Sequence, residues 1–131
     1  MTTIQTGITV EACIQACLDC YRHCQHTALT HCLEQGGKHT EPAHFRLMLD
    51  CAEVCRSTAA LLLNESAFAT ELCALCAEIC ERCAQSCERL GDMQDCQHHC
   101  EYCAETCRQM AKAPPSPHHA RRTGAAHPHA G

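Results

Sequence analysis

The sequence has few of the residues that ordinarily fill a protein core. It contains no Trp, two Tyr and two Phe. Leu, Ile, Val and Phe together make up only about 15% of its 131 residues, less than the roughly 20% below which an ordinary packed core is in doubt. This length suits one domain and is too short for two comfortable ones. The chain is therefore either disordered or built around another kind of core residue.

The sequence also lacks the features that lead proteins to membranes, nucleic acids or the cell exterior. No run of 18 apolar residues predicts a transmembrane helix. The net charge of −5 and the absence of a basic block argue against nucleic acid and anionic membrane surfaces as partners. The first residues, MTTIQTGITVEAC, contain no basic n-region, twin-Arg pair or apolar h-region. We therefore expect a cytoplasmic protein.

Cysteine is what the sequence has in abundance. The cytoplasm keeps thiols reduced, so clustered cysteines there indicate metal or redox chemistry and not a disulfide scaffold. Most of them alternate at spacings of three and four residues, which is typical of the inward seam of a helix in a bundle. The sixteen cysteines are Cys13, Cys17, Cys20, Cys24, Cys32, Cys51, Cys55, Cys73, Cys76, Cys80, Cys83, Cys87, Cys96, Cys100, Cys103 and Cys107.

This periodicity predicts an all-α fold, an antiparallel up-down-up-down four-helix bundle with a Cys-lined core over residues 1–112. We expect helices at about 9–35, 41–63, 66–90 and 93–112. Residues 113–131 have no periodicity and are expected to form a disordered His-rich tail. Its histidines could bind a divalent metal, although a polar tail without a role is the simpler interpretation; they are His118, His119, His127 and His129.

Capping residues mark the expected helix ends. Thr9 caps the first helix, and the Gly36–Gly37 pair ends it. Thr40, followed by Glu41 and Pro42, opens the second. We expect the third helix to start at Asn64 or Ser66 and to end at Gly91, and Asp92 to cap the fourth.

The thiol seams suit metal ions better than disulfides. Side chains three or four residues apart on a helix have Cβ atoms about 5–6 Å apart, whereas a disulfide needs about 3.5–4.5 Å. With metal–sulfur bonds near 2.3 Å or slightly less, a two-coordinate ion bridges sulfur atoms roughly 4–4.6 Å apart. One or two buried cysteines would be ordinary small apolar residues. Thiols pack less well than Leu, however, so stability alone does not explain sixteen of them on matching seams.

Cu(I) is the metal that this arrangement favours. Thiolate-only surroundings select Cu(I), Zn(II) or iron–sulfur clusters. Several Zn(Cys)₄ sites would each leave two negative charges in a dry core, whereas about one monovalent ion per thiolate brings the core charge toward zero. Capacity on the order of 16 Cu(I) ions follows. A zinc- or iron–sulfur-binding structural protein and a thiol redox buffer are the alternatives.

Three cysteine runs carry a family resemblance: ELCALCAEICERCAQSC (71–87), EACIQACLDC in the first helix and CEYCAETC in the fourth. Over about residues 8–111 the chain resembles the cytosolic branch of the bacterial copper storage proteins. The resemblance implies Cu(I) stored on core thiolates, commonly in a homotetramer, with metal entering at one end of each bundle. A copper chaperone or a recipient protein is a further expected partner. A second helix with only two cysteines departs from the family pattern, as does the His-rich tail.

Helical phase predicts which end is the mouth. The first seam continues to His31, with Cys32 about 90° to one side, while His44 and Met48 share a stripe with Cys51 and Cys55. In antiparallel order one end gathers the exchangeable Cu(I) ligands His31, His44, Met48 and Met93 beside Cys87. The other end gathers an apolar plug of Ile8, Val10, Leu61, Leu62, Leu63 and Phe68. His23, His26 and His98 are expected at the surface, and His99 is intermediate.

Catalysis is not expected. The sequence shows no nucleophile–base–orienter set, Gly-rich phosphate loop or acid pair. The predicted function is storage and detoxification of Cu(I).

Overall fold

The structure is a computed structural model, and residues 8–112 are described. The predictions for the N-terminal segment and for the histidines of residues 113–131 lie outside the described residues. The elements in chain order are α2 (Val10–Thr27), the π-helical turn η1 (Ala28–Cys32), α3 (Leu33–Gln35), the 3-10 turn η2 (Gly37–Thr40), α4 (Pro42–Leu63), α5 (Ala69–Leu90) and α6 (Gln94–Lys112).

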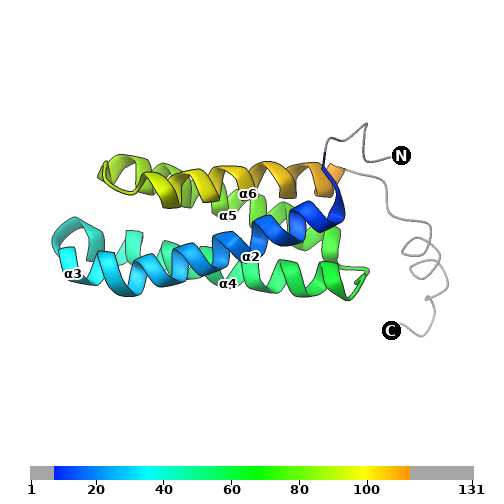
Figure 1. Ribbon diagram of the computed structural model, residues 1–131, viewed down its shortest axis with the longest axis horizontal. Coiled ribbons are helices and arrows are strands. Elements are labelled where there is room, and N and C mark those ends of the chain that lie inside the picture. Colours follow the sequence, from blue (N-terminus) through cyan, green and yellow to red (C-terminus); the bar gives the residue numbers. More distant parts are fainter. Residues whose placement is uncertain (1–7, 113–131) are drawn as a thin grey trace.

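The four long helices form an antiparallel up-down-up-down bundle (Figure 1). α2 packs against α4 and α6, and α5 packs against the same two helices. α3 and the α5–α6 turn lie at one end of the bundle, while the α4–α5 turn lies at the other (Figure 1). The predicted fold class is confirmed. No helix within residues 8–112 is long and apolar enough to cross a membrane.

Local chemistry explains two of the helix ends. The Thr9 hydroxyl accepts a hydrogen bond from the Ala12 N–H (2.9 Å), which confirms the predicted cap. α5 ends at Gly91, whose φ of 92° is left-handed and whose N–H donates to the Cys87 carbonyl (3.3 Å). Glycine enters that region without the steric cost of a Cβ, so the chain turns sharply into α6.

Two predicted helix starts are wrong. α5 begins at Ala69 and not at Asn64 or Ser66, because residue 65 takes a positive φ of 52° and Ser66 accepts the Phe68 N–H (3.0 Å) in a turn of its own. The carboxylate of Asp92 was expected to cap the fourth helix. It instead contacts two histidines on the opposite turn, and α6 begins at Gln94.

Cysteine and alanine together fill the core. All sixteen cysteines are buried, fifteen of them with no exposed surface and Cys96 at 2%. Small alanines are buried beside them on every long helix, for example Ala16, Ala52, Ala84 and Ala104. Alanine lets helices approach closely, because no longer side chain separates them. The core thus needs little Leu, Ile, Val and Phe, because thiols fill it.

The predicted apolar plug is confirmed only in part: Ile8 and Leu62 are partly buried and pack against the core. Val10, Leu63 and Phe68 are 48%, 62% and 70% exposed in this chain, because they lie at the helix ends with no further layer of the bundle above them. The buried layer at this end consists of Cys13, Cys73 and Cys107, with the hydroxyls of Thr58 and Thr106 satisfied by carbonyls of their own helices. Small residues thus form the buried layer at this end, and Ile8 and Leu62 are the predicted plug residues that pack against the core.

Candidate metal centre

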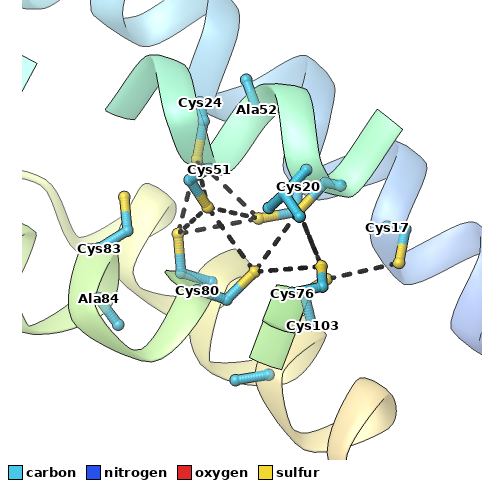
Figure 2. Close-up of a cluster of buried hydrophobic side chains, with 14 of the residues drawn as sticks. Cys17, Cys20, Cys24, Cys51, Ala52, Cys76, Cys80, Cys83, Ala84 and Cys103 are labelled. Carbon is cyan, nitrogen blue, oxygen red and sulfur yellow. Dashed lines mark hydrogen bonds between the residues drawn. The ribbon is translucent and has the colours of Figure 1, made fainter. Parts of the chain in front are cut away.

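The Sγ atoms of the sixteen core cysteines form a row along the bundle axis, which we call the sulfur column. Sulfurs on different helices come as close as 3.4 Å between Cys55 and Cys80 and 3.5 Å between Cys24 and Cys100. Figure 2 shows the central part, where thiols from all four helices point toward one another. All sixteen are free thiols. The seams predicted from spacing therefore meet in one continuous interior.

Twelve cysteines of the sulfur column fall into groups that share members. Three groups hold four thiols and one holds three, and in each group every pair of Sγ atoms lies within 4.8 Å. Cys103 and Cys20 each belong to two of the four-thiol groups, and Cys107 joins one of these to the three-thiol group. The groups are Cys17–Cys76–Cys103–Cys107, Cys20–Cys24–Cys51–Cys100, Cys20–Cys55–Cys80–Cys103 and Cys13–Cys73–Cys107.

These separations fit a shared, low-coordinate ion. With metal–sulfur bonds of about 2.3 Å, a three-coordinate ion places its sulfur ligands about 4 Å apart, and a two-coordinate ion about 4.6 Å apart. Most of the contacting Sγ pairs in the structure lie 3.6–3.9 Å apart. A small rotation of the side chains would therefore admit ions between sulfurs, whereas a disulfide would require contraction to about 2 Å.

A π-helical turn, η1, follows α2 and determines which of its residues face the core. Cys24, Ala28 and Cys32 are all fully buried, because η1 adds a residue to the turn and rotates the chain that follows it. The sequence prediction assumed an uninterrupted α-helix, which placed His31 on the seam and Cys32 to one side. The structure places Cys32 inward and leaves the His31 side chain 36% exposed.

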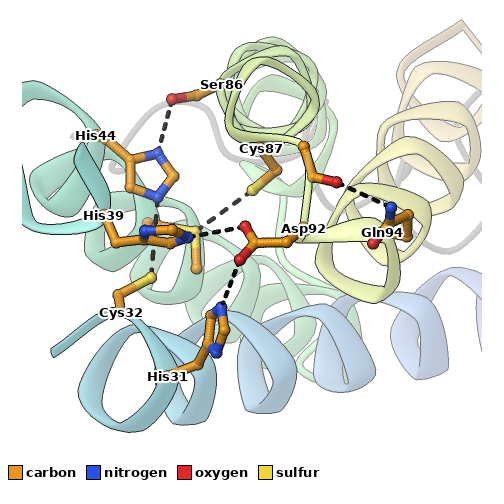
Figure 3. Close-up of polar contacts among 10 residues, drawn as sticks. His31, Cys32, His39, His44, Ser86, Cys87, Asp92 and Gln94 are labelled. Atoms are coloured by element: carbon orange, nitrogen blue, oxygen red, sulfur yellow. Dashed lines mark hydrogen bonds and ion pairs between the residues drawn. The ribbon is translucent and has the colours of Figure 1, made fainter. Parts of the chain in front are cut away.

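Two of the predicted mouth residues lie against the thiols. The Met48 sulfur is fully buried and accepts hydrogen bonds from Cys83 (3.6 Å) and Cys87 (3.7 Å). The His44 ring is buried with Nε2 3.9 Å from the Cys32 Sγ, as Figure 3 shows. Met93 is buried at the same end. The Met48 thioether and the His44 imidazole thus continue the sulfur column at this end.

Ser86 is a neighbour of His44 that the sequence did not predict. Its hydroxyl lies 2.7 Å from His44 Nδ1, on the side of the ring opposite Cys32 (Figure 3). Such a partner fixes the ring orientation and lets Nε2 face the thiol. Nothing in the sequence distinguishes a serine between cysteines on a helix as the partner of a histidine on another helix.

Burial keeps both partners at this contact uncharged. It lowers the pKa of His44, so the imidazole is neutral at pH 7 and its Nε2 can offer a lone pair. It also raises the pKa of the Cys32 thiol to about 11. A metal ion that binds Cys32 must therefore displace the thiol proton, so acid opposes such binding.

A second polar cluster at this end brings together His31, His39 and Asp92 (Figure 3). His39 Nε2 lies 2.8 Å from one Asp92 carboxylate oxygen, and His31 Nε2 lies 3.4 Å from the other. The hydrogen bond with His39 lowers the pKa of Asp92 below its ordinary value. His39 and Asp92 were not among the predicted site residues, because each lies in a short turn between helices.

The remaining histidines lie on the outside of the bundle. His26 and His98 are exposed, as expected. His23 and His99 are partly buried and stack across α2 and α6 with ring centroids 4.1 Å apart. Their position does not extend the sulfur column.

The thiol-lined bundle matches a known protein family. The family model described as "Copper storage protein" matches residues 7–115. The chain belongs to the copper storage protein family. The resemblance inferred from the cysteine runs is confirmed, and the family is one of storage proteins and not of enzymes.

Two solved structures match most of the bundle. The Nmul_A1745 protein of Nitrosospira multiformis is 51% identical, with a TM-score of 0.77 over 78% of this chain and 94% of that one. The Cu(I)-bound copper storage protein BsCsp3 is 42% identical, with a TM-score of 0.71 over 77% of this chain and 96% of that one.

A curated relative matches over a shorter stretch. The uncharacterised cysteine-rich protein YhjQ of Bacillus subtilis is 42% identical over 66 residues, which are 50% of this chain. The chain spans 60% of the length of that protein.

Proposed function

We propose that the protein stores Cu(I) ions on the thiolates of the sulfur column and so serves copper homeostasis and detoxification in the cytoplasm. The observation that carries this proposal is the sharing of thiols between neighbouring groups, with Cys20, Cys103 and Cys107 each in two of them. Shared ligands suit an ion that accepts two or three thiolates. The Cu(I)-bound state of the similar BsCsp3 supports the choice of metal.

Charge favours filling the whole column. A thiolate in a buried core is costly unless a cation lies beside it. One Cu(I) for each thiolate brings the net charge of the core toward zero, so each added ion relieves the charge left by its neighbours. Zn(II) prefers four thiolates in a closed tetrahedron, and separate Zn(Cys)₄ sites would each leave two negative charges in the core. We propose all sixteen cysteines as ligands.

We propose that copper enters at the end formed by η1, η2 and the α5–α6 turn. There Met48 faces Cys83 and Cys87, and His44 faces Cys32. Imidazole and thioether bind Cu(I) less tightly than thiolate does, which suits capture followed by transfer inward. Ser86 holds the His44 ring in place. The predictions that His31 and Met93 also bind Cu(I) stay predictions, and the His31 ring contacts Asp92 and His39.

Titration with Cu(I) tests the storage function. Under anaerobic conditions, thiolate-to-metal absorbance of the reduced protein is expected to rise linearly to on the order of 16 equivalents, because each ion needs about one thiolate. Proton release should accompany loading, since buried thiols such as Cys32 are protonated beforehand. Elemental analysis after removal of loose copper with a strong chelator gives the retained number of ions.

The same experiment separates the alternatives. Saturation at one or two equivalents would contradict storage. Purification with tetrahedral Zn(II) or with a brown chromophore, together with failure to compete for Cu(I), would instead indicate a zinc or iron–sulfur protein.

A double substitution tests the mouth. His44→Ala with Met48→Leu should slow the early phase of Cu(I) loading while leaving the final capacity close to that of the natural protein, because the deeper thiols are untouched. The matched control is His98→Ala with Met110→Leu, which changes the same residue types outside the sulfur column. Stopped-flow absorbance measures the rate. A loading rate equal to that of the natural protein would remove the mouth assignment.

The oligomeric state is also a proposal. Several large apolar side chains are exposed on this single chain, among them Leu29, Leu33, Leu75 and Tyr102. Covering such residues stabilises an assembly through burial of apolar surface. We propose a homotetramer, as the family resemblance implies, and a chaperone or recipient protein as the source and destination of the copper.

A further inference from the structure

We propose that His31, His39 and Asp92 form a site for a divalent cation of the Zn(II) class, separate from the thiolates that hold Cu(I). The site does not depend on the storage function, because none of its ligands is a thiol. Its three residues come from η1, η2 and the α5–α6 turn, which meet at one end of the bundle (Figures 1 and 3).

The distances suit one shared ion. The ligand atoms of the three residues all lie within 4.8 Å of one another. Around a tetrahedral Zn(II) with bonds of about 2.1 Å, two ligand atoms lie about 3.4 Å apart. His31 Nε2 and Asp92 Oδ2 are 3.4 Å apart, and His39 Nε2 and Asp92 Oδ1 are 2.8 Å apart. An ion between them requires only a slight opening of the cluster.

The histidine rings already face a common point. They meet edge to face, with centroids 5.1 Å apart and planes at 88°, an arrangement that lets both Nε2 atoms face one ion. His31 Nε2 is itself buried and makes no hydrogen bond of good geometry, although it faces the Asp92 carboxylate. A buried nitrogen without a hydrogen-bond partner needs an explanation, and a metal ion at this position would provide one.

The donor set selects the metal class. Two imidazoles and a carboxylate suit borderline divalent ions, whereas Cu(I) prefers sulfur. The His39 side chain is 10% exposed and anchors the site, while the Asp92 side chain is 50% exposed. A water molecule can therefore complete the coordination from the open side, as at a three-ligand zinc site. The bound ion would join the α2–α4 connection to the α5–α6 turn.

The experiment uses the full chain with its thiols already filled by Cu(I), so that the core does not compete for the probe. The probe is Co(II), which replaces Zn(II) and reports its ligands in the visible spectrum. We compare the natural protein with Asp92→Asn and His39→Ala. His98→Ala is the matched control, because His98 is an exposed histidine on α6 outside the cluster.

We expect the natural protein and His98→Ala each to bind one Co(II) per chain. The bound Co(II) should show no sulfur-to-cobalt band, and added Zn(II) should displace it. Asp92→Asn and His39→Ala should bind it about 10-fold or more weakly. Unchanged Cu(I) capacity and circular dichroism in both variants show that the bundle is intact. Equal Co(II) binding by all four proteins would overturn the site, as would a sulfur-to-cobalt band in place of the expected spectrum.

Discussion

Replacing Cys20 and Cys103 together by serine is expected to remove more Cu(I) from the protein than the two lost thiols would account for. Each of these cysteines belongs to two four-thiol groups, so the double change leaves all three such groups incomplete. We expect a loss of roughly four or more ions, because Cu(I) at those groups needs two or three sulfur ligands. Anaerobic titration followed by chelator challenge measures the loss.

The matched control is the double serine variant of Cys73 and Cys96. Cys73 belongs to one group and Cys96 to none, and the Cys96 thiol donates to the His23 carbonyl (3.8 Å). This variant also removes two buried thiols, so its effect on packing is similar, and it should lose about two ions or fewer. Equal losses in the two variants would show that the thiols act independently and that sharing does not govern capacity.

Cu(I) loading is expected to raise the unfolding temperature of the protein by more than about 20 °C. The core of the metal-free chain consists mostly of thiols and alanines, which stabilise a fold less than Leu and Ile do. Each ion shared between sulfurs of different helices adds a link that unfolding must break, for example between Cys55 on α4 and Cys80 on α5. Anaerobic circular dichroism during heating, with and without copper, gives the shift.

The metal-free protein should nevertheless be helical before heating, since buried free thiols and alanines are apolar enough to hold each long helix against two others. An apo state with no helical signal would mean that metal drives folding, as in small zinc domains. A shift of only a few degrees would place the bound ions outside the core.

Much of the bundle could be predicted because cysteine spacing records helical phase directly. The runs around Cys17, Cys80 and Cys100 repeat at three and four residues, so each inward face could be assigned from the sequence alone. The prediction failed where the backbone departs from 3.6 residues per turn. The π-helical turn places Cys32 inward in place of His31, and nothing in its sequence, ALTHC, predicts a π-helix.

The remaining errors concern the ends of the helices. An apolar plug was expected from Val10 and Phe68, but a side chain at a helix end has no layer above it to bury it. Asp92 was interpreted as a cap, although its carboxylate contacts His39, 53 residues away in the chain. Pairings between two turns depend on tertiary packing, and no local sequence rule predicts them. Ser86 was missed for the same reason.

The closed layer at Cys13, Cys73 and Cys107 has a consequence for the order in which copper leaves. If ions enter and leave through the opposite end only, the column behaves as a stack: the last ion in is the first out. The deepest ions can reach solvent only after those in front of them have moved, whatever their own affinity. The rate of release is then set by the few ligands at the proposed entry, including His44 and Met48, and not by the number of ions in store.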